Sequence, residues 1–85
     1  MFYIYIIKSD KDGSYYIGSC KDIKKRLAQH NCGLVKSTKK GVPWSLAYQE
    51  IYQELKDARR RELQIKSWKK RGAIERLIKH SKNLS

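Results

Sequence analysis

Residues 3–19 have the sequence YIYIIKSDKDGSYYIGS, in which a turn sequence separates two strand-like runs. The first run, FYIYII over residues 2–7, is β-branched and aromatic without a polar break. That pattern predicts a strand that is buried on both faces and therefore central in its sheet. Asp12-Gly13 is a strong hairpin signal, so the following YYIGS is expected to return as the second, antiparallel strand.

The rest of the chain predicts one more strand and three helices. Asp22 is suited to cap the first helix, because its side chain can accept a backbone N–H bond. In the third strand, Leu46 and Tyr48 alternate with more polar neighbours. The expected elements are a helix over about 23–32, a loop over 33–43, a strand over 44–52, a helix over about 56–70 that Gly72 ends, and a last helix over about 73–80.

This order, β-β-α-β-α-α, predicts an α+β fold in which helices pack against a three-stranded sheet. The chain has 85 residues and no repeats or linkers, so a single domain over residues 1–85 is expected. A domain of this size buries only roughly 60% of its unfolded surface, which leaves a small core.

The charge of the chain favours a polyanionic partner. Twenty Lys and Arg residues oppose eight Asp and Glu residues, which gives a formal net charge of +12. Nucleic acid is the first candidate for this partner, and an anionic membrane surface is the second. The sequence predicts no membrane-spanning helix and no signal peptide, so a cytoplasmic protein with free Cys20 and Cys32 thiols is expected.

Tyrosines on both arms of the predicted hairpin raise the question of chemistry. Tyr5 lies on one face of the first strand, and Tyr16 shares a face of the second strand with Gly18. A glycine beside Tyr16 leaves space for a close approach by a backbone or a ligand. The alternative is that these tyrosines only pack in the small core.

Arg26 and His30 lie one turn apart on the first predicted helix, beside the apolar stripe of Ile23 and Leu27. Both side chains are therefore expected to point toward the edge of the sheet. The alternatives are that Arg26 is one more solvated cation, and that His30 interacts favourably with the C-terminal end of its helix.

Glu62 is the most unusual residue of the second long helix. It falls inside the apolar stripe that Leu55, Ala58 and Ile65 define. Burying an unpaired carboxylate costs several kcal/mol, so Glu62 needs a partner. The alternatives are a salt bridge to Arg59 or Lys66, one turn away, and a role as an oxygen ligand for a hard divalent cation.

Basic residues concentrate in the second helix and in the loop before the third strand. Phosphate contacts are the expected role of the most prominent ones, with solvated surface as the alternative. They are Lys36, Lys39, Lys40, Arg59, Lys66, Lys69, Lys70 and Arg71. Two tyrosines, an arginine, a histidine and one carboxylate among so many cations suit phosphodiester hydrolysis.

These residues resemble the motifs of the GIY-YIG endonuclease superfamily, and in particular its small stand-alone bacterial members and the nuclease domain of an excinuclease subunit. The two signature elements are Tyr3-Ile4-Tyr5, with Tyr3 in place of the usual glycine, and Tyr16-Ile17-Gly18. DIKKRLAQHN is similar to the first-helix motif, and ARRRELQIKSW to the second. VKSTKKGVPWSLAY resembles the loop and third strand of the stand-alone group.

The resemblance implies a three-stranded antiparallel sheet flanked by helices, and hydrolysis by a water nucleophile with a single Mg²⁺ or Mn²⁺ ion. It implies that Glu62 binds the metal, that Arg26 holds the scissile phosphate and that His30 assists proton transfer. Tyr5 and Tyr16 are implied to position and deprotonate the water, with the choice of base left open, and Gly18 supports the site.

Three interpretations follow. The first is a metal-dependent endonuclease acting on DNA that is branched, damaged or single-stranded. The second is a nucleic-acid-binding module that lacks useful turnover or that a protein partner activates, with RNA as another ligand. The third, a ribosome- or membrane-associated basic protein, explains the charge but not a glutamate on an apolar stripe.

Overall fold

The structure is a computed structural model that describes residues 1–68 and 70–83. Three antiparallel strands form its sheet: β1 (Phe2–Ser9), β2 (Tyr15–Cys20) and β3 (Trp44–Tyr52). Their order is β2-β1-β3, so β1 is the central strand and β2 is an edge strand. The predicted α+β fold with the order β-β-α-β-α-α is therefore confirmed.

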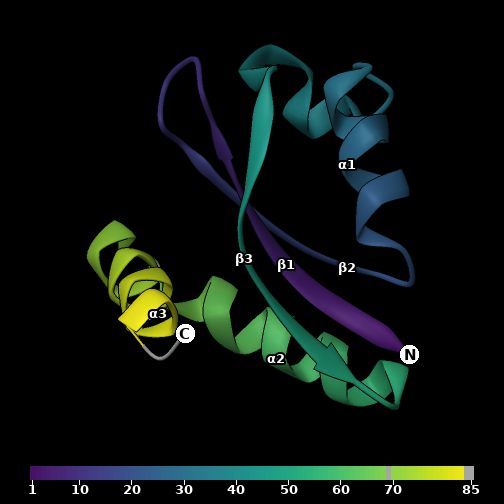
Figure 1. The fold of residues 1–85 in the computed structure, drawn as a ribbon, viewed down its shortest axis with the longest axis vertical. Helices are drawn as coiled ribbons and strands as arrows, with labels where there is room; N and C mark the ends of the chain where they lie inside the picture. The colour runs from purple at the N-terminus through teal and green to yellow at the C-terminus, as the bar shows by residue number, and fades with distance from the viewer. Residues whose placement is uncertain (69, 84–85) are drawn as a thin grey trace.

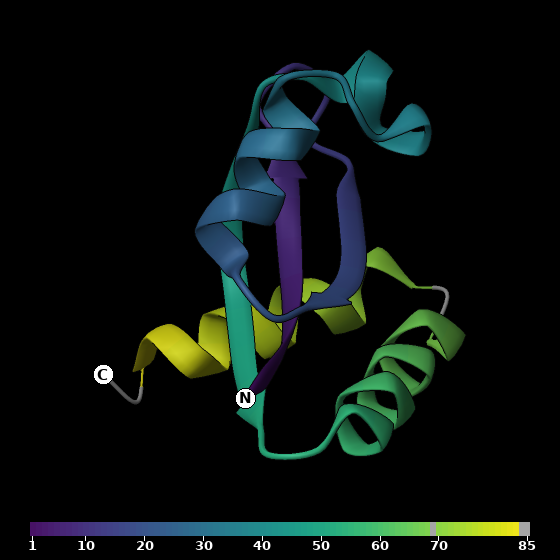
Figure 2. The ribbon, with the colours of Figure 1, turned by 90° about the vertical axis from the view of Figure 1, so that its right-hand side faces the viewer.

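Helices cover both faces of this sheet. In Figure 2, α1 (Ile23–Asn31) lies in front of the strands and α3 (Arg71–Asn83) behind them. Figure 1 shows α2 (Leu55–Ser67) crossing near the end of the sheet where the N-terminus lies. The candidate site lies beside the edge strand β2.

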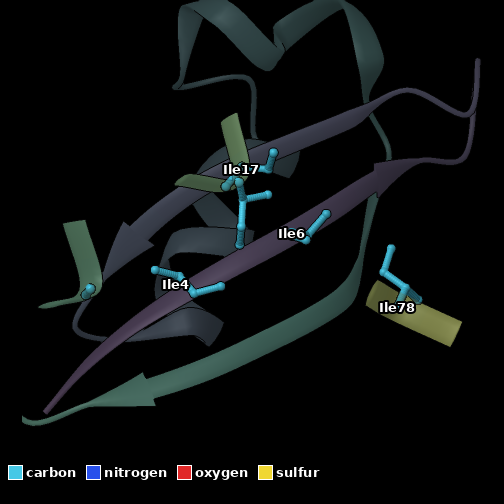
Figure 3. Packing of buried hydrophobic residues seen from close by; sticks show 6 residues of the cluster. Ile4, Ile6, Ile17 and Ile78 are labelled. Atoms are coloured by element: carbon cyan, nitrogen blue, oxygen red, sulfur yellow. The ribbon is translucent and has the colours of Figure 1, made fainter. Parts of the chain in front are cut away.

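Alternation along β1 supplies a core on each face. Ile4 and Ile6 pack with Ile17 of β2 and with side chains of α2 and α3, among them Ile78 (Figure 3). Tyr5 and Ile7 face the opposite way, toward Trp44, Ile23 and Leu27. The central strand is buried on both faces because a helical layer covers each of them.

The hairpin turn and the start of α1 match their predicted signals. Gly13 in the hairpin has a φ of 77°, which a residue with a side chain adopts only with strain. Asp22 accepts a hydrogen bond from the Lys25 backbone N–H at 3.1 Å and so caps α1. The backbone N–H of Gly33 bonds to the His30 carbonyl at 3.1 Å, just past the end of the helix.

The prediction that Gly72 ends the second helix is wrong. α2 ends at Ser67, and Gly72 lies in the first turn of α3. The last turn of α2 tightens, because the Trp68 N–H bonds to the Ile65 carbonyl at 3.2 Å and the Ser67 hydroxyl bonds to the Gln64 carbonyl at 2.6 Å. Glycine is tolerated at the start of α3, because its cost in conformational entropy is largest in a helix interior.

Two features of residues 33–52 were not predicted. The expected loop contains a 3₁₀ helix, η1 (Lys36–Gly41). A bulge then shifts the pairing of β3, because Ile6 pairs with Tyr48 whereas Ile7 pairs with Leu46. Leu46 is 40% exposed, and Trp44 is the residue of β3 that is buried.

No helix among residues 1–68 and 70–83 is long and apolar enough to cross a membrane.

Candidate active site

A polar pocket of about 380 Å³ lies at the open edge of the sheet, beside β2. Its walls come from β1 and β2, from α1 on one face of the sheet and from α2 on the other. The lining residues are Tyr5, Tyr16, Gly18, Ser19, Arg26, Arg59, Glu62 and Leu63. The residues predicted to catalyse, to bind the metal or to support the site therefore meet in one pocket, except for His30, which lies directly behind Tyr5.

Gly18 allows Tyr5 to occupy its position. The two residues are partners across β1 and β2, and the phenol of Tyr5 lies over the glycine. A Cβ atom at position 18 would be 2.5 Å from the Tyr5 hydroxyl and 2.7 Å from its Cζ. Such distances are far below van der Waals contact, so any larger residue would displace the phenol. The space that Gly18 leaves is taken by Tyr5, although the prediction had placed it beside Tyr16.

His30 is fully buried between two hydroxyl groups. Its Nε2 is 2.9 Å from the Tyr5 hydroxyl, and its Nδ1 is 2.7 Å from Oγ1 of Thr38. The ring also packs edge-on against the Tyr16 ring, with 5.1 Å between centroids. His30 is therefore placed to act on the pocket through Tyr5, and not by direct contact.

Arg26 brings a positive charge to the pocket. One of its terminal nitrogens donates to the Gln29 side chain at 3.2 Å. Its Nε is buried and, among the described residues, has no hydrogen-bond partner. The Arg26 side chain also lines the pocket, where its positive charge suits an anionic ligand.

Glu62 faces the pocket while it pairs with Lys66. The Lys66 ammonium lies 2.6 Å from the Glu62 carboxylate, and the Glu62 side chain is 18% exposed. One of the two alternatives for Glu62, the salt bridge to Lys66, is therefore present. The apolar stripe is narrower than predicted, since Ala58 and Ile65 are buried whereas Leu55 is 38% exposed.

The pocket fits a magnesium-type ion held by one carboxylate. Among the described residues, no three His, Cys, Asp or Glu side chains gather into a group that could hold a metal. Mg²⁺ does not need such a group, because it keeps several waters and binds through one or two carboxylates together with substrate phosphates. Glu62 is the carboxylate that would hold such an ion here, and the pocket has room for the waters.

Burial favours the neutral forms of the Tyr5 phenol and the His30 imidazole. It raises the pKa of Tyr5 above the ordinary 10.0, although the neighbouring Arg26 acts in the opposite direction. Burial also lowers the pKa of His30 below the ordinary 6.5, and the Arg26 charge adds to this effect. At neutral pH the pair is an uncharged phenol beside an uncharged imidazole.

A sequence model of the GIY-YIG catalytic domain matches residues 1–80. The chain belongs to the GIY-YIG family. Two tyrosines of the motifs named above, Tyr5 and Tyr16, line the pocket, whereas Tyr3 does not. The domain is that of a nuclease family, and the names of the relatives below give no specific activity, metal or substrate.

Similar proteins occur in bacteria. A UPF0213 protein of Staphylococcus saprophyticus is 46% identical over 74 residues, which cover 86% of this chain and 89% of that protein. UPF0213 proteins of Staphylococcus aureus strains are 41% identical over 78 residues, covering 91% and 93%. The solution NMR structure of a UPF0213 protein from Bacillus halodurans, 30% identical, superposes with a TM-score of 0.59 over 93% of this chain and 84% of that chain.

A groove adjoins the polar pocket and shares Tyr16 with it. Its volume is about 440 Å³, and it lies between β2, α2 and α3. Tyr15, Ile17, Ile65 and Ile74 contribute apolar surface, and three predicted phosphate-binding residues, Lys66, Lys70 and Arg71, also line it. The Arg71 guanidinium lies 4.9 Å from the centre of the Tyr15 ring.

The other predicted phosphate contacts are dispersed. Arg59 lines the polar pocket itself. Lys36, Lys39 and Lys40 lie exposed on η1 and border neither the pocket nor the groove. Lys69 lies outside the described residues.

A polar cluster holds α2, and with it Glu62, against β3. Arg61 bonds to the Glu50 carboxylate through Nε at 3.0 Å, and the hydroxyls of Tyr48 and Tyr52 donate to the same carboxylate. The Arg61 guanidinium also lies 5.6 Å from the centre of the Trp68 ring. This cluster, the pocket residues Ser19 and Leu63, and Thr38 behind His30 were not predicted, since none of them lies in a regular pattern that marks a site.

Proposed function

We propose that this protein is a metal-dependent endonuclease that hydrolyses phosphodiester bonds in DNA with a water nucleophile and one Mg²⁺ or Mn²⁺ ion. The observation that carries the proposal is the convergence of Tyr5, Tyr16, Arg26 and Glu62 on one polar pocket. Their elements are β1, β2, α1 and α2, which are separated in sequence. Packing alone does not require a phenol, a guanidinium and a carboxylate at the same opening.

Each residue has a distinct role in the proposed reaction. Arg26, whose charged side chain lines the pocket, binds the scissile phosphate and stabilises the charge that builds on it. Tyr5 takes a proton from the attacking water, with His30 behind it, and Tyr16 helps to position that water. Glu62 holds the metal ion, which when bound lowers the pKa of a coordinated water and offsets phosphate charge.

The adjoining groove supports a polynucleotide as the substrate. Phosphates on either side of the scissile one need cations beside the pocket. Lys66, Lys70 and Arg71 along the groove and Arg59 in the pocket meet this need. The same groove offers an aromatic side chain, Tyr15, beside these cations, a combination that suits nucleic acid better than a simple phosphate ester.

The second candidate is a nucleic-acid-binding module that does not cleave unless a protein partner activates it. The ion pair between Lys66 and Glu62 favours this candidate, because it holds the proposed metal ligand on an ammonium group at 2.6 Å. A partner or a substrate phosphate that attracts Lys66 away from Glu62 frees the carboxylate for the metal.

The test is cleavage of labelled single-stranded, duplex, flap and four-way-junction DNA, with matched RNA, in Mg²⁺, Mn²⁺ or EDTA. Binding to each substrate is measured in parallel by fluorescence anisotropy in EDTA. Cleavage that needs the divalent ion supports the endonuclease and ranks its substrates. Tight binding without cleavage of any substrate in either metal contradicts it and favours the binding module.

A further inference from the structure

Thr38 lies behind the proposed site in a position that its sequence context does not explain. It is 1% exposed, although it belongs to a short helix rich in lysine and serine. Its Oγ1 is 2.7 Å from Nδ1 of His30, whose other nitrogen is 2.9 Å from the Tyr5 hydroxyl. The three side chains form a continuous buried chain that ends at the pocket.

The single hydroxyl proton of Thr38 sets the direction of this chain. Thr38 Oγ1 is 3.3 Å from the Val35 carbonyl, which can only accept a hydrogen bond. When the hydroxyl donates there, its oxygen can only accept from His30, so Nδ1 of His30 carries the ring proton. Nε2 is then the acceptor, and the Tyr5 hydroxyl must donate to it.

We propose that Thr38 is a positioning residue that fixes His30 in the Nδ1–H tautomer, so that Tyr5 donates its proton to His30 and its oxygen accepts from the pocket side. This inference rests on the proposed nuclease function for its catalytic meaning, but the tautomer itself is a property of the protein without substrate.

Several contacts hold Thr38 in place. The Trp44 indole N–H donates to the Thr38 carbonyl at 2.9 Å, and the Asn31 side chain bonds to both backbone groups of Trp44, at 2.6 and 3.0 Å. Ser9 donates to the Gly41 carbonyl at 2.6 Å, at the end of the same short helix. A Cβ atom at Gly41 would be 2.4 Å from the Trp44 ring, so Trp44 packs directly on the η1 backbone.

The tautomer determines which way a proton can move. As the attacking water gives a proton to the Tyr5 oxygen, the phenolic proton passes to His30 Nε2, and the electron pair of the broken water O–H bond becomes the nucleophile. The positive charge comes to rest on His30. In the opposite tautomer, Nε2 already carries a proton and cannot receive the one from Tyr5, so the relay is blocked.

The test compares the wild type with Thr38→Val, which keeps the shape of the side chain but removes the hydroxyl, and with Thr38→Ser, which keeps the hydroxyl. The ¹⁵N chemical shifts of the His30 ring in protein free of metal and DNA give the tautomer directly, with exposed His80 as an internal reference. We expect Nδ1–H in the wild type and in Thr38→Ser, and a shift toward Nε2–H in Thr38→Val.

Single-turnover cleavage provides the second readout. We expect Thr38→Val to be about 10- to 100-fold slower at unchanged DNA affinity, as for other supporting residues of active sites, and Thr38→Ser to recover most of the rate. An Nε2–H tautomer in the wild type overturns the inference even if Thr38→Val fails to fold, and so does a Thr38→Val variant that cleaves at the wild-type rate.

The two proposals fail differently. If the wild type has the Nδ1–H tautomer but cleaves no nucleic acid in any metal, the proposed function is wrong and the assignment of Thr38 to the tautomer stands. If the wild type cleaves but shows the Nε2–H tautomer, the nuclease stands and the role of Thr38 is wrong.

Discussion

Gly18 is the position in the site where a single carbon atom has the largest expected effect. We predict that Gly18→Ala slows cleavage by about 100-fold, because the new Cβ would lie 2.5 Å from the Tyr5 hydroxyl and force the phenol away from His30. Overpacking of this kind also destabilises a fold by about 1–3 kcal/mol. Single-turnover rates and thermal unfolding measure the two effects.

Gly72→Ala is the matched control for this substitution. Apart from its chain neighbours and the backbone of its own helix, no described atom lies within 4 Å of the Cβ position at Gly72, which is in the first turn of α3, so the variant is expected to cleave normally and to be at least as stable as the wild type. Equal rates for Gly18→Ala and the wild type would show that the position of Tyr5 does not matter for the reaction.

At the residue scale, the sequence predicted which side chains gather but not all of their contacts. Tyr5, Tyr16, Arg26 and Glu62 could be predicted because each lies in a motif whose strand or helix spacing is regular. Thr38 could not, because it lies in a segment without periodicity, and its contact with His30 depends on how η1 folds back over α1.

At the scale of elements, hydrophobic pattern and turn signals predicted the hairpin, the central position of β1 and the start of α1. They did not predict the register of β3 or the end of α2, because contacts outside the hydrophobic pattern decide both. The bulge in β3 depends on pairing with β1, which alternation within β3 cannot reveal, and the early end of α2 depends on a tightened last turn.

The tyrosines that hold α2 against β3 through Glu50 should make the free energy of unfolding depend on pH at high pH. Burial first, and then the Glu50 carboxylate, raises the pKa of Tyr48 and of Tyr52 from 10.0 to about 12. Above pH 10 these tyrosines ionise in the unfolded chain before they do so in the folded protein, so the unfolded state is favoured. We predict that the free energy of unfolding decreases progressively between about pH 10 and pH 12.

Urea unfolding across this range, for the wild type and for a Tyr48→Phe and Tyr52→Phe double variant, measures the effect. The double variant removes both titrating groups, so its stability should depend less on pH over the same interval. Tyr5, whose pKa is also raised, remains in both proteins and cancels in the comparison. If the free energy of unfolding depended on pH equally in the two proteins, ionisation of Tyr48 and Tyr52 would not be the cause of the loss of stability.

At the scale of the whole molecule, the net charge of +12 means that the proposed binding of nucleic acid should depend on salt. We predict that Lys70→Gln, in the groove, reduces the slope of log K against log salt by about 1, because one phosphate contact is lost. Lys24→Gln removes the same charge from α1, outside the pocket and the groove, and should leave the slope nearly unchanged. Binding titrations at four salt concentrations separate the two, and equal slopes would mean that the groove is not the binding surface.

Metal-dependent hydrolysis through Glu62 is the central claim, and a single-turnover cleavage assay with Glu62→Gln tests it most directly. Glu54→Gln is the control, since Glu54 is also paired with a lysine, Lys56, but lies exposed at the start of α2. We predict that Glu62→Gln is slower by about 100-fold or more in saturating Mg²⁺ or Mn²⁺, while it binds DNA and unfolds like the wild type, and that Glu54→Gln cleaves normally. Cleavage by Glu62→Gln at the wild-type rate, or wild-type cleavage that persists in EDTA, would contradict this account.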